Sequence, residues 1–176
     1  PYRTRKVTMY CYGNKETWYL NKVPSGMLPA IEIDNNLFTE SDQILLELEN
    51  KFGPLGLSLE CPGILDLRLL ERKLFRSWCI WLCQPSLLKK QEQFKQEQFQ
   101  RFAREMETHI QESNGPWLDP STTSEINSKP GSVDLIFIPY LERMNASLAY
   151  YKGFNLRKEH PLINKWLETL EKKPIY

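Results

Sequence analysis

Two short segments carry residue types that could hold a peptide-like ligand, and the first of them is Leu28-Pro29. The proline stands just ahead of a segment in which apolar and polar residues alternate. Proline cannot donate to a sheet, and a cis bond before it would turn the backbone of Leu28 outward, where an extended peptide could pair with it. An ordinary loop proline is the alternative, and position alone favours it because cis bonds are rare.

The second segment is Glu40-Ser41, which stands at an expected helix start. The free N–H groups of a helix N-terminus bind carboxylates, and a serine hydroxyl adds a donor. Plain helix capping is the alternative and is favoured for this segment alone, because Thr39, Ser41 and Asp42 are all common cap residues. Taken together, the two segments flank one predicted hairpin and would form a clamp for a small peptide.

The elements that must position this clamp follow from hydrophobic periodicity and turn residues. The sequence predicts a strand at Arg3–Met9, a short helix at Lys15–Leu20, a strand at 30–34, a turn at Asn35-Asn36, a strand from Leu37, and a helix that ends at Gly53. This order, with a Leu-Pro before the second strand, is typical of the second half of a thioredoxin-like domain. We therefore expect a partial thioredoxin-like domain at residues 1–53.

The rest of the chain reads as helical. Residues 54–63 are rich in glycine and proline and are predicted to be a linker, and 64–176 is predicted to be an all-helical domain. Apolar residues recur at spacings of three and four in its first helix, which Pro85 should end. They are Leu67, Leu70, Leu74, Trp78 and Trp81. Further helices are expected over 99–110, with a solvated helical segment at Gln91–Gln100 ahead of it, and over Val133–Tyr151 and Asn164–Lys172. A loop is expected over Asp119–Lys129.

Composition excludes several function classes. The chain has 176 residues and a formal net charge of +1, so it lacks the basic excess that nucleic-acid binders usually carry. No apolar run approaches the roughly 20 residues that span a bilayer. Four cysteines and two histidines make no zinc spacing, so we expect no metal site. Free cysteines favour a reducing compartment, cytoplasm or chloroplast stroma, although no targeting segment is visible.

Three stretches in this order resemble the glutathione site of cytosolic glutathione transferases. They are Lys15–Trp18, Val23–Glu32 and Thr39–Ser41. The similarity is closest to the omega-like and lambda-like classes and to plant and algal proteins. Val133–Leu135 and the His160-to-Tyr176 segment resemble the helical domain of the same family. The resemblance implies a mixed α/β plus all-α chain: a partial thioredoxin-like domain followed by the helical C-terminal domain of a glutathione transferase.

The resemblance also implies roles for individual residues. Leu28, before a cis Pro29, would pair with the cysteinyl backbone of glutathione, while Glu40 and Ser41 would hold its γ-glutamyl end. Lys15 would reach the glycyl carboxylate; a solvated surface lysine is the alternative. Trp78 and Trp81 lie on the helix that in the family faces the second-substrate pocket, but core aromatics at helical spacing are the better-supported interpretation.

The sequence departs from the family pattern at two places. The catalytic Cys, Ser or Tyr of the family lies between the first strand and the first helix, so the catalytic residue is expected upstream of Pro1 and its type is unknown. The family's capping Ser or Thr, three residues before Asp134, is here Gly131, so the side-chain bond of a capping box is lost unless Ser132 replaces it in a shifted helix start.

Two functions from different classes remain open. In the first, the protein is an enzyme that binds glutathione as a substrate and uses its thiol on a small electrophile or a disulfide, by conjugation or thiol–disulfide exchange. In the second, it is a non-catalytic accessory or scaffold subunit of a larger, for example chloroplast, assembly, because a fold does not fix a function. A homodimer and a subunit of a larger assembly are both compatible with the sequence, whereas no nucleic-acid partner and no transmembrane segment are expected.

Overall fold

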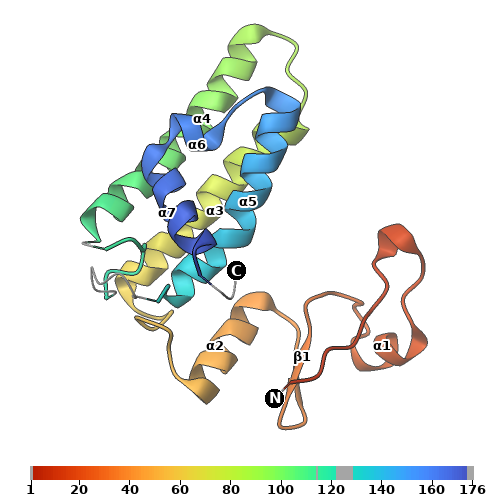
Figure 1. The fold of residues 1–176 in the computed structure, drawn as a ribbon. Coiled ribbons are helices and arrows are strands. Elements are labelled where there is room, and N and C mark those ends of the chain that lie inside the picture. The colour runs from red at the N-terminus through yellow and green to blue at the C-terminus, as the bar shows by residue number, and fades with distance from the viewer. Residues whose placement is uncertain (1, 114, 122–128, 174–176) are drawn as a thin grey trace. The chain divides into compact units, whose positions relative to one another are not determined.

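The computed structural model describes residues 2–113, 115–121 and 129–173, and the chain divides into two compact units, Pro1–Gly53 and Pro54–Tyr176 (Figure 1). Besides a 3-10 turn at Tyr10–Tyr12, the described residues of the first unit form two helices and two strands. These are α1 (Thr17–Lys22), β1 (Ile31–Ile33), β2 (Asn36–Phe38) and α2 (Ser41–Phe52). Helices are the only regular secondary structure among the described residues of the second unit.

An antiparallel hairpin forms the only sheet among the described residues. Ile31 lies opposite Phe38, and Ile33 lies opposite Asn36. The two residues between the strands, Asp34 and Asn35, have positive φ angles of 50° and 66°. Asp and Asn tolerate this conformation, which gives the tight turn that suits the twist of a hairpin. The predicted turn at Asn35-Asn36 is therefore one residue too late, because Asn36 already pairs in β2.

The strand predicted at Arg3–Met9 is wrong. In the described residues this segment has no ladder partner, since the sheet contains β1 and β2 alone. A strand needs a neighbour to accept its backbone hydrogen bonds, and alternating side chains cannot supply one. Side chains satisfy part of the segment instead: Thr8 N–H donates to the carboxylate of Glu16, and the Lys15 ammonium donates to the carbonyl of Thr8.

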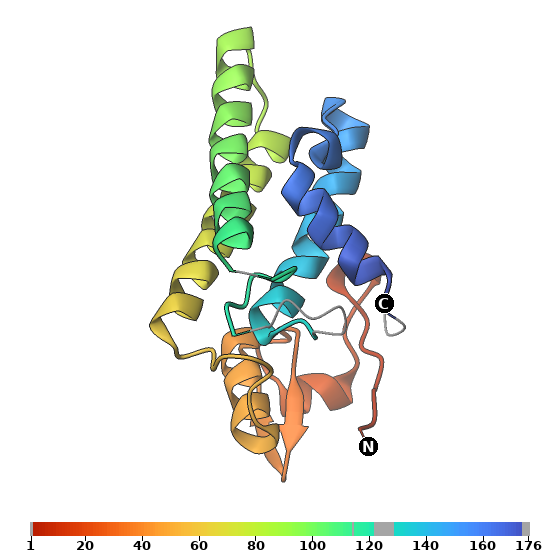
Figure 2. The ribbon, with the colours of Figure 1, turned by 60° about the vertical axis from the view of Figure 1, so that its left-hand side comes forward.

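The described residues of the second unit form five helices, and Figure 2 shows the two longest of them side by side. They are α3 (Pro62–Cys83), α4 (Lys89–Glu112), α5 (Ser132–Lys152), α6 (Leu156–Glu159) and α7 (Pro161–Glu171). α3 packs against both α4 and α5, and α7 packs against α4. The apolar stripe of α3 faces this core, with Leu67, Leu70, Leu74 and Trp81 all buried.

Several helices begin or end at the proline and glycine residues that the sequence offers as helix boundaries. α3 ends at Cys83, ahead of Pro85, and α2 ends before Gly53, whose φ is 84°. α7 begins at Pro161, three residues earlier than predicted, because a proline is well suited to the first position of a helix. α6 is a single turn that the sequence did not predict. No helix among the described residues is long and apolar enough to cross a membrane.

Candidate ligand-binding site

The β1–β2 hairpin brings the two predicted binding segments to the same end of one element. Because Ile31 pairs with Phe38, the chain enters β1 and leaves β2 at the open end of the hairpin. Leu28-Pro29 lies just before this paired end and Glu40-Ser41 just after it. Neighbouring strands lie about 4.8 Å apart. The register therefore places a backbone edge and a helix N-terminus close together in the first unit.

Leu28 presents a free stretch of backbone at this end. Its peptide bond to Pro29 is cis. Leu28 itself is 39% exposed, and among the described residues its N–H and C=O have no hydrogen-bond partner. The preceding carbonyl, of Met27, is held by the hydroxyl of buried Tyr19, which fixes the loop against α1. The free N–H and C=O of Leu28 could pair with one residue of an extended peptide.

Glu40 and Ser41 form the start of α2. Glu40 is the N-cap residue in extended conformation, and its carbonyl accepts from Ile44 N–H at 2.8 Å. Its side chain makes no capping hydrogen bond, and both Glu40 and Ser41 are exposed. The N-terminal turn of α2 is thus not closed by the side chain of its N-cap residue, and Asp42 is the acidic residue of this turn. The positive end of a helix dipole attracts anions.

Lys15 lies beside this loop but is not exposed. Its side chain is 7% exposed and packs against Gly26, where an added Cβ would lie 3.3 Å from Lys15 Cδ. The ammonium donates to the carbonyl of Thr8 at 2.9 Å and sits 4.9 Å from the ring centre of Tyr10. The structure therefore brings Lys15 to the loop before Leu28, with its charge already held by Thr8 rather than solvated.

Thr8 and Glu16 are two further residues at this place that sequence reasoning missed. The Glu16 carboxylate accepts from Thr8 N–H at 3.2 Å and from Thr8 Oγ1 at 2.8 Å. Hydrogen bonds from its own backbone N–H and from Thr8 lower the pKa of Glu16. Lys15 and Glu16 thus bind the three polar groups of Thr8 between them. Their adjacent opposite charges were the available signal, but nothing in the sequence pointed to Thr8.

Trp78 and Trp81 are placed differently from each other in the second unit. Trp81 is 2% exposed, and its ring contacts Phe99 and Phe154 in an aromatic cluster. Trp78 is half-buried, and its indole N–H donates to Ser147 Oγ at 3.0 Å. Trp81 is a core residue in this arrangement, so of the two only Trp78 keeps a side chain that a second substrate could reach.

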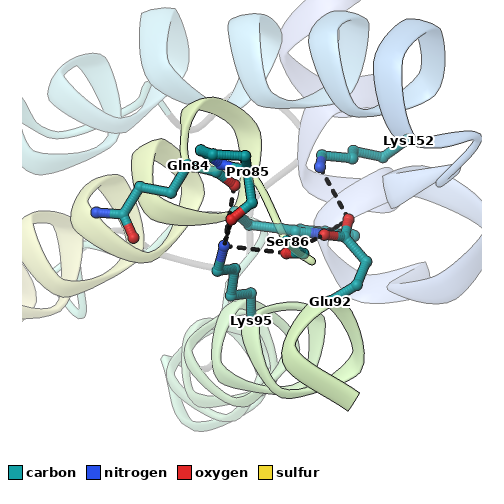
Figure 3. Close-up of polar contacts among 7 residues, drawn as sticks. Gln84, Pro85, Ser86, Glu92, Lys95 and Lys152 are labelled. Carbon is teal, nitrogen blue, oxygen red and sulfur yellow. Dashed lines mark hydrogen bonds and ion pairs between the residues drawn. The ribbon is translucent and has the colours of Figure 1, made fainter. Parts of the chain in front are cut away.

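A cluster of polar contacts ties the α3–α4 loop to α5 (Figure 3). The Glu92 carboxylate accepts from the Trp81 indole at 2.8 Å, from Ser86 at 2.7 Å and from the Lys152 ammonium at 2.8 Å. Hydrogen bonds from Lys152, then Ser86 and Trp81, lower the pKa of Glu92 to about 2. Lys95 closes the same loop by donating to the carbonyls of Gln84 and Pro85. These contacts hold the α3–α4 loop and the end of α5 together.

Asp134 explains how α5 begins without the family's capping side chain. The carboxylate is fully buried and accepts from Leu118 N–H at 2.7 Å, Trp166 Nε1 at 2.8 Å and Gly131 N–H at 3.1 Å. Burial raises the pKa of Asp134, and these bonds oppose the rise. Gly131 is the N-cap, so the helix start does not shift to make Ser132 the cap.

The close approach of Asp119 explains why position 131 holds a glycine. A Cβ added to Gly131 would lie 2.1 Å from Asp119 Oδ2 and 2.6 Å from Asp119 Cβ. The buried carboxylate of Asp119 accepts a hydrogen bond from Leu57 N–H at 2.9 Å. A capping serine or threonine would therefore overlap Asp119, and the departure from the family pattern follows from this neighbour.

No group of three or more His, Cys, Asp or Glu that could hold a metal ion occurs in the part of the chain that the structure describes. Cys11, Cys61, Cys79 and Cys83 are free thiols. Burial, together with the neighbouring Cys83, raises the pKa of Cys79, which disfavours its reactive thiolate. Cys79 therefore lacks the lowered pKa that marks a catalytic cysteine.

Comparisons with known proteins bear on the family and the fold of the chain. Residues 1–51 match the family model for the N-terminal domain of glutathione S-transferase. Glutathione S-transferase DHAR2 of Arabidopsis thaliana is 22% identical over 170 residues, which cover 97% of this chain and 71% of that protein. A probable chloroplastic glutathione S-transferase DHAR2 of rice is 23% identical, and this chain spans 56% of its length.

Solved structures show the same fold. Chlamydomonas reinhardtii dehydroascorbate reductase superposes with a TM-score of 0.68 and 20% identity, covering 92% of this chain and 69% of that one. A trimeric glutathione transferase of Leishmania, TDR1, gives 0.67 and 18%, covering 91% of this chain and 35% of that one. The predicted fold class, a partial thioredoxin-like unit followed by a helical domain, is confirmed. The predicted resemblance is confirmed: by its N-terminal match, its plant relatives and its fold, the chain is similar to glutathione transferases of the cytosolic type.

Proposed function

We propose that the protein binds glutathione at the open end of the β1–β2 hairpin and serves a glutathione-dependent transfer or thiol-exchange reaction. The observation that carries the proposal is the pairing of two unsatisfied features at one place. The backbone of Leu28 is free, and the N-terminus of α2 at Ser41 is not closed by the side chain of its N-cap residue. A γ-glutamyl tripeptide needs both: a strand-like edge for its middle and a helix N-terminus for a carboxylate.

The residues have separate tasks in this proposal. The N–H and C=O of Leu28 pair with the cysteinyl residue of glutathione and fix where its sulfur points. The Ser41 hydroxyl and the first N–H groups of α2 hold the γ-glutamyl carboxylate, and the Glu40 carboxylate attracts its ammonium group. Trp78 is half-buried on α3, and its role toward a second substrate stays a prediction from the family resemblance.

The chemistry that glutathione would supply is nucleophilic attack by its thiolate. On an electrophilic carbon a C–S bond forms and the leaving group departs with its electron pair; on a disulfide a new S–S bond forms and a thiolate leaves. The algal structure is a dehydroascorbate reductase by name. Dehydroascorbate is therefore the first substrate to assay: its two-electron reduction would consume two glutathione molecules and yield one glutathione disulfide.

One observation favours a second candidate, a non-catalytic role. Lys15, expected to hold the glycyl carboxylate, is buried with its ammonium bound to Thr8 and facing Tyr10. If this arrangement persists with ligand present, the site lacks a free cation at that end. The site would then bind glutathione weakly or not at all. The protein would act as a non-catalytic accessory subunit that binds a partner protein through the same fold.

Calorimetric titration with glutathione tests the proposal. We expect binding in the micromolar to millimolar range for the wild-type protein, weakened about tenfold or more in Ser41→Ala because one hydrogen bond to a charged group is lost. Ser132→Ala is the matched control, since Ser132 is also the first residue of a helix, α5, and should bind like wild type. Absence of heat with the wild-type protein would leave the accessory role as the better explanation.

A further inference from the structure

One end of the helical unit exposes a group of large apolar side chains, which we call the bundle tip. It consists of the loop between α3 and α4, the first turns of α4 and the last turn of α5. Leu87 is 92% exposed, and Leu88 and Phe94 are exposed beside it on the loop and α4. Tyr150 and Tyr151 are exposed on α5. Five large apolar side chains are thus exposed at one end of the unit, where exposed apolar surface is a candidate interaction site.

These residues belong to one end of the unit because a hydrogen-bonded ion pair joins its parts. Lys152, the last residue of α5, contacts Glu92 in the first turn of α4 at 2.8 Å. The rings of Tyr150 and Tyr151, in contact with each other at 4.7 Å between centres, precede Lys152 in the same turn. The α3–α4 loop and the end of α5 lie at the same end of the helical unit in both ribbon views (Figures 1 and 2).

The charge of the bundle tip is positive. Residues 84–96 contain three lysines and a single acidic residue, Glu92. The lysines are Lys89, Lys90 and Lys95. That acid is neutralised by Lys152 and also accepts from Ser86 and Trp81. Lys95 is engaged with the loop carbonyls, whereas Lys89 and Lys90 are exposed. Two exposed lysines, Lys89 and Lys90, therefore directly follow the exposed Leu87 and Leu88 in the chain.

The same residues are a poor choice for starting a helix. Leu88 is the N-cap of α4, a position at which Ser, Thr, Asp and Asn are strongly preferred. Lys89 and Lys90 are the first two helical residues, where the positive end of the helix dipole repels a cation. Three consecutive residues thus work against the stability of α4. Sequences break such local rules mainly at functional sites, so a role outside folding is indicated.

We infer that the bundle tip docks on a membrane surface that contains anionic phospholipid. The leucines and aromatic rings enter the interfacial layer, and Lys89 and Lys90 face the phosphate headgroups. Leu87 stands free of neighbouring side chains, and a bilayer interface accepts protruding apolar groups without needing a complementary pocket. The docking requires no membrane-spanning helix, and it does not depend on the glutathione site of the first unit.

Vesicle sedimentation tests this inference with the whole protein. Vesicles of phosphatidylcholine alone are compared with vesicles that also contain about one third phosphatidylglycerol, at low and high salt. We expect binding to the anionic vesicles only. Leu87→Ser/Leu88→Ser should weaken it at least tenfold, because apolar burial in the interface is lost. Lys89→Gln/Lys90→Gln should weaken it by roughly tenfold or more, with a smaller salt dependence.

The control is Leu65→Ser/Leu69→Ser, which removes two exposed leucines near the other end of α3. This variant should bind vesicles like wild type, and circular dichroism verifies that each variant is folded. Removing the two lysines should not harm folding, since it relieves repulsion at the start of α4. Failure of the wild-type protein to bind, or an equal loss in the control, overturns the inference; an acidic partner protein would then be the occupant to seek.

Discussion

At the scale of single residues, Glu92 links three parts of the helical unit and gives a pH dependence that can be measured. Its pKa is lowered from an ordinary 4.5 to about 2. The folded state therefore takes up this proton at a lower pH than the unfolded state does. The stabilisation is therefore complete above about pH 4.5 and is lost as the pH falls toward 2. Because the side chain is 36% exposed, water screens the effect, and we expect about 1 kcal/mol.

Glu92→Gln tests this prediction. The difference in free energy of unfolding between wild type and Glu92→Gln, followed by urea denaturation, should shrink as the pH falls from 5 to 3. Glu97→Gln is the control, since Glu97 is an exposed glutamate on the same helix, and it should show no such trend. A difference that stays constant with pH would mean that the contacts of Glu92 are not formed in solution.

Gly131 supports a second prediction at this scale. From the family pattern alone, Gly131→Ser should restore a helix cap and stabilise the protein. The structure predicts the opposite, because the new Cβ would lie 2.1 Å from Asp119 Oδ2. Overpacking of this kind costs about 1–3 kcal/mol. Urea unfolding should show that loss, while Gly63→Ser, whose Cβ meets nothing within 4 Å, should be close to neutral.

At the scale of elements, the hairpin turn determines how well the two halves of the candidate site are held together. Asn35 has a φ of 66°, which costs most side chains about 1–2 kcal/mol. We predict that Asn35→Ala speeds amide exchange in Ile31–Phe38 and weakens glutathione binding, whereas Asn35→Gly does neither. Exchange followed by mass spectrometry gives the first quantity and calorimetry the second. Equal exchange in the alanine and glycine variants would contradict the assigned turn.

The elements that local patterns determine were predictable, and those that depend on distant partners were not. The helices of the second unit follow from apolar spacing and from Pro85, and the hairpin follows from alternation around Asn35. Arg3–Met9 alternates too, but a strand exists only where a second strand accepts its hydrogen bonds. The single turn of α6 is too short to carry a periodic signal.

The candidate site divides in the same way. Leu28-Pro29 and Glu40-Ser41 could be found because a proline before a strand and polar residues at a helix start are local signals. The burial of Lys15 could not, since it depends on Thr8 and the ring of Tyr10. Contacts such as Glu92 to Lys152 and Glu107 to His160 join residues 60 and 53 positions apart, and no spacing rule connects them.

At the scale of the whole molecule, the two units have very unequal cores. Among the described residues, the buried apolar side chains of the first unit are Tyr19, Val23 and Ile44, and all others belong to the second unit. A two-stranded hairpin has little stability of its own, and local stability follows the amount of buried apolar contact. The first unit, which carries the candidate glutathione site, should therefore open more often than the second.

This imbalance gives a prediction for hydrogen exchange over the full chain. Without ligand, amides in 2–53 should exchange faster than those of α3, α4 and α5. Saturating glutathione should slow exchange mainly in residues 26–44, because a ligand stabilises only the states that bind it, by about 2.7 kcal/mol at a hundred times its dissociation constant. Ser41→Ala should reduce this protection and Ser132→Ala should not. Protection that appears in the helices but not in 26–44 would place the ligand elsewhere and remove the hairpin from the site.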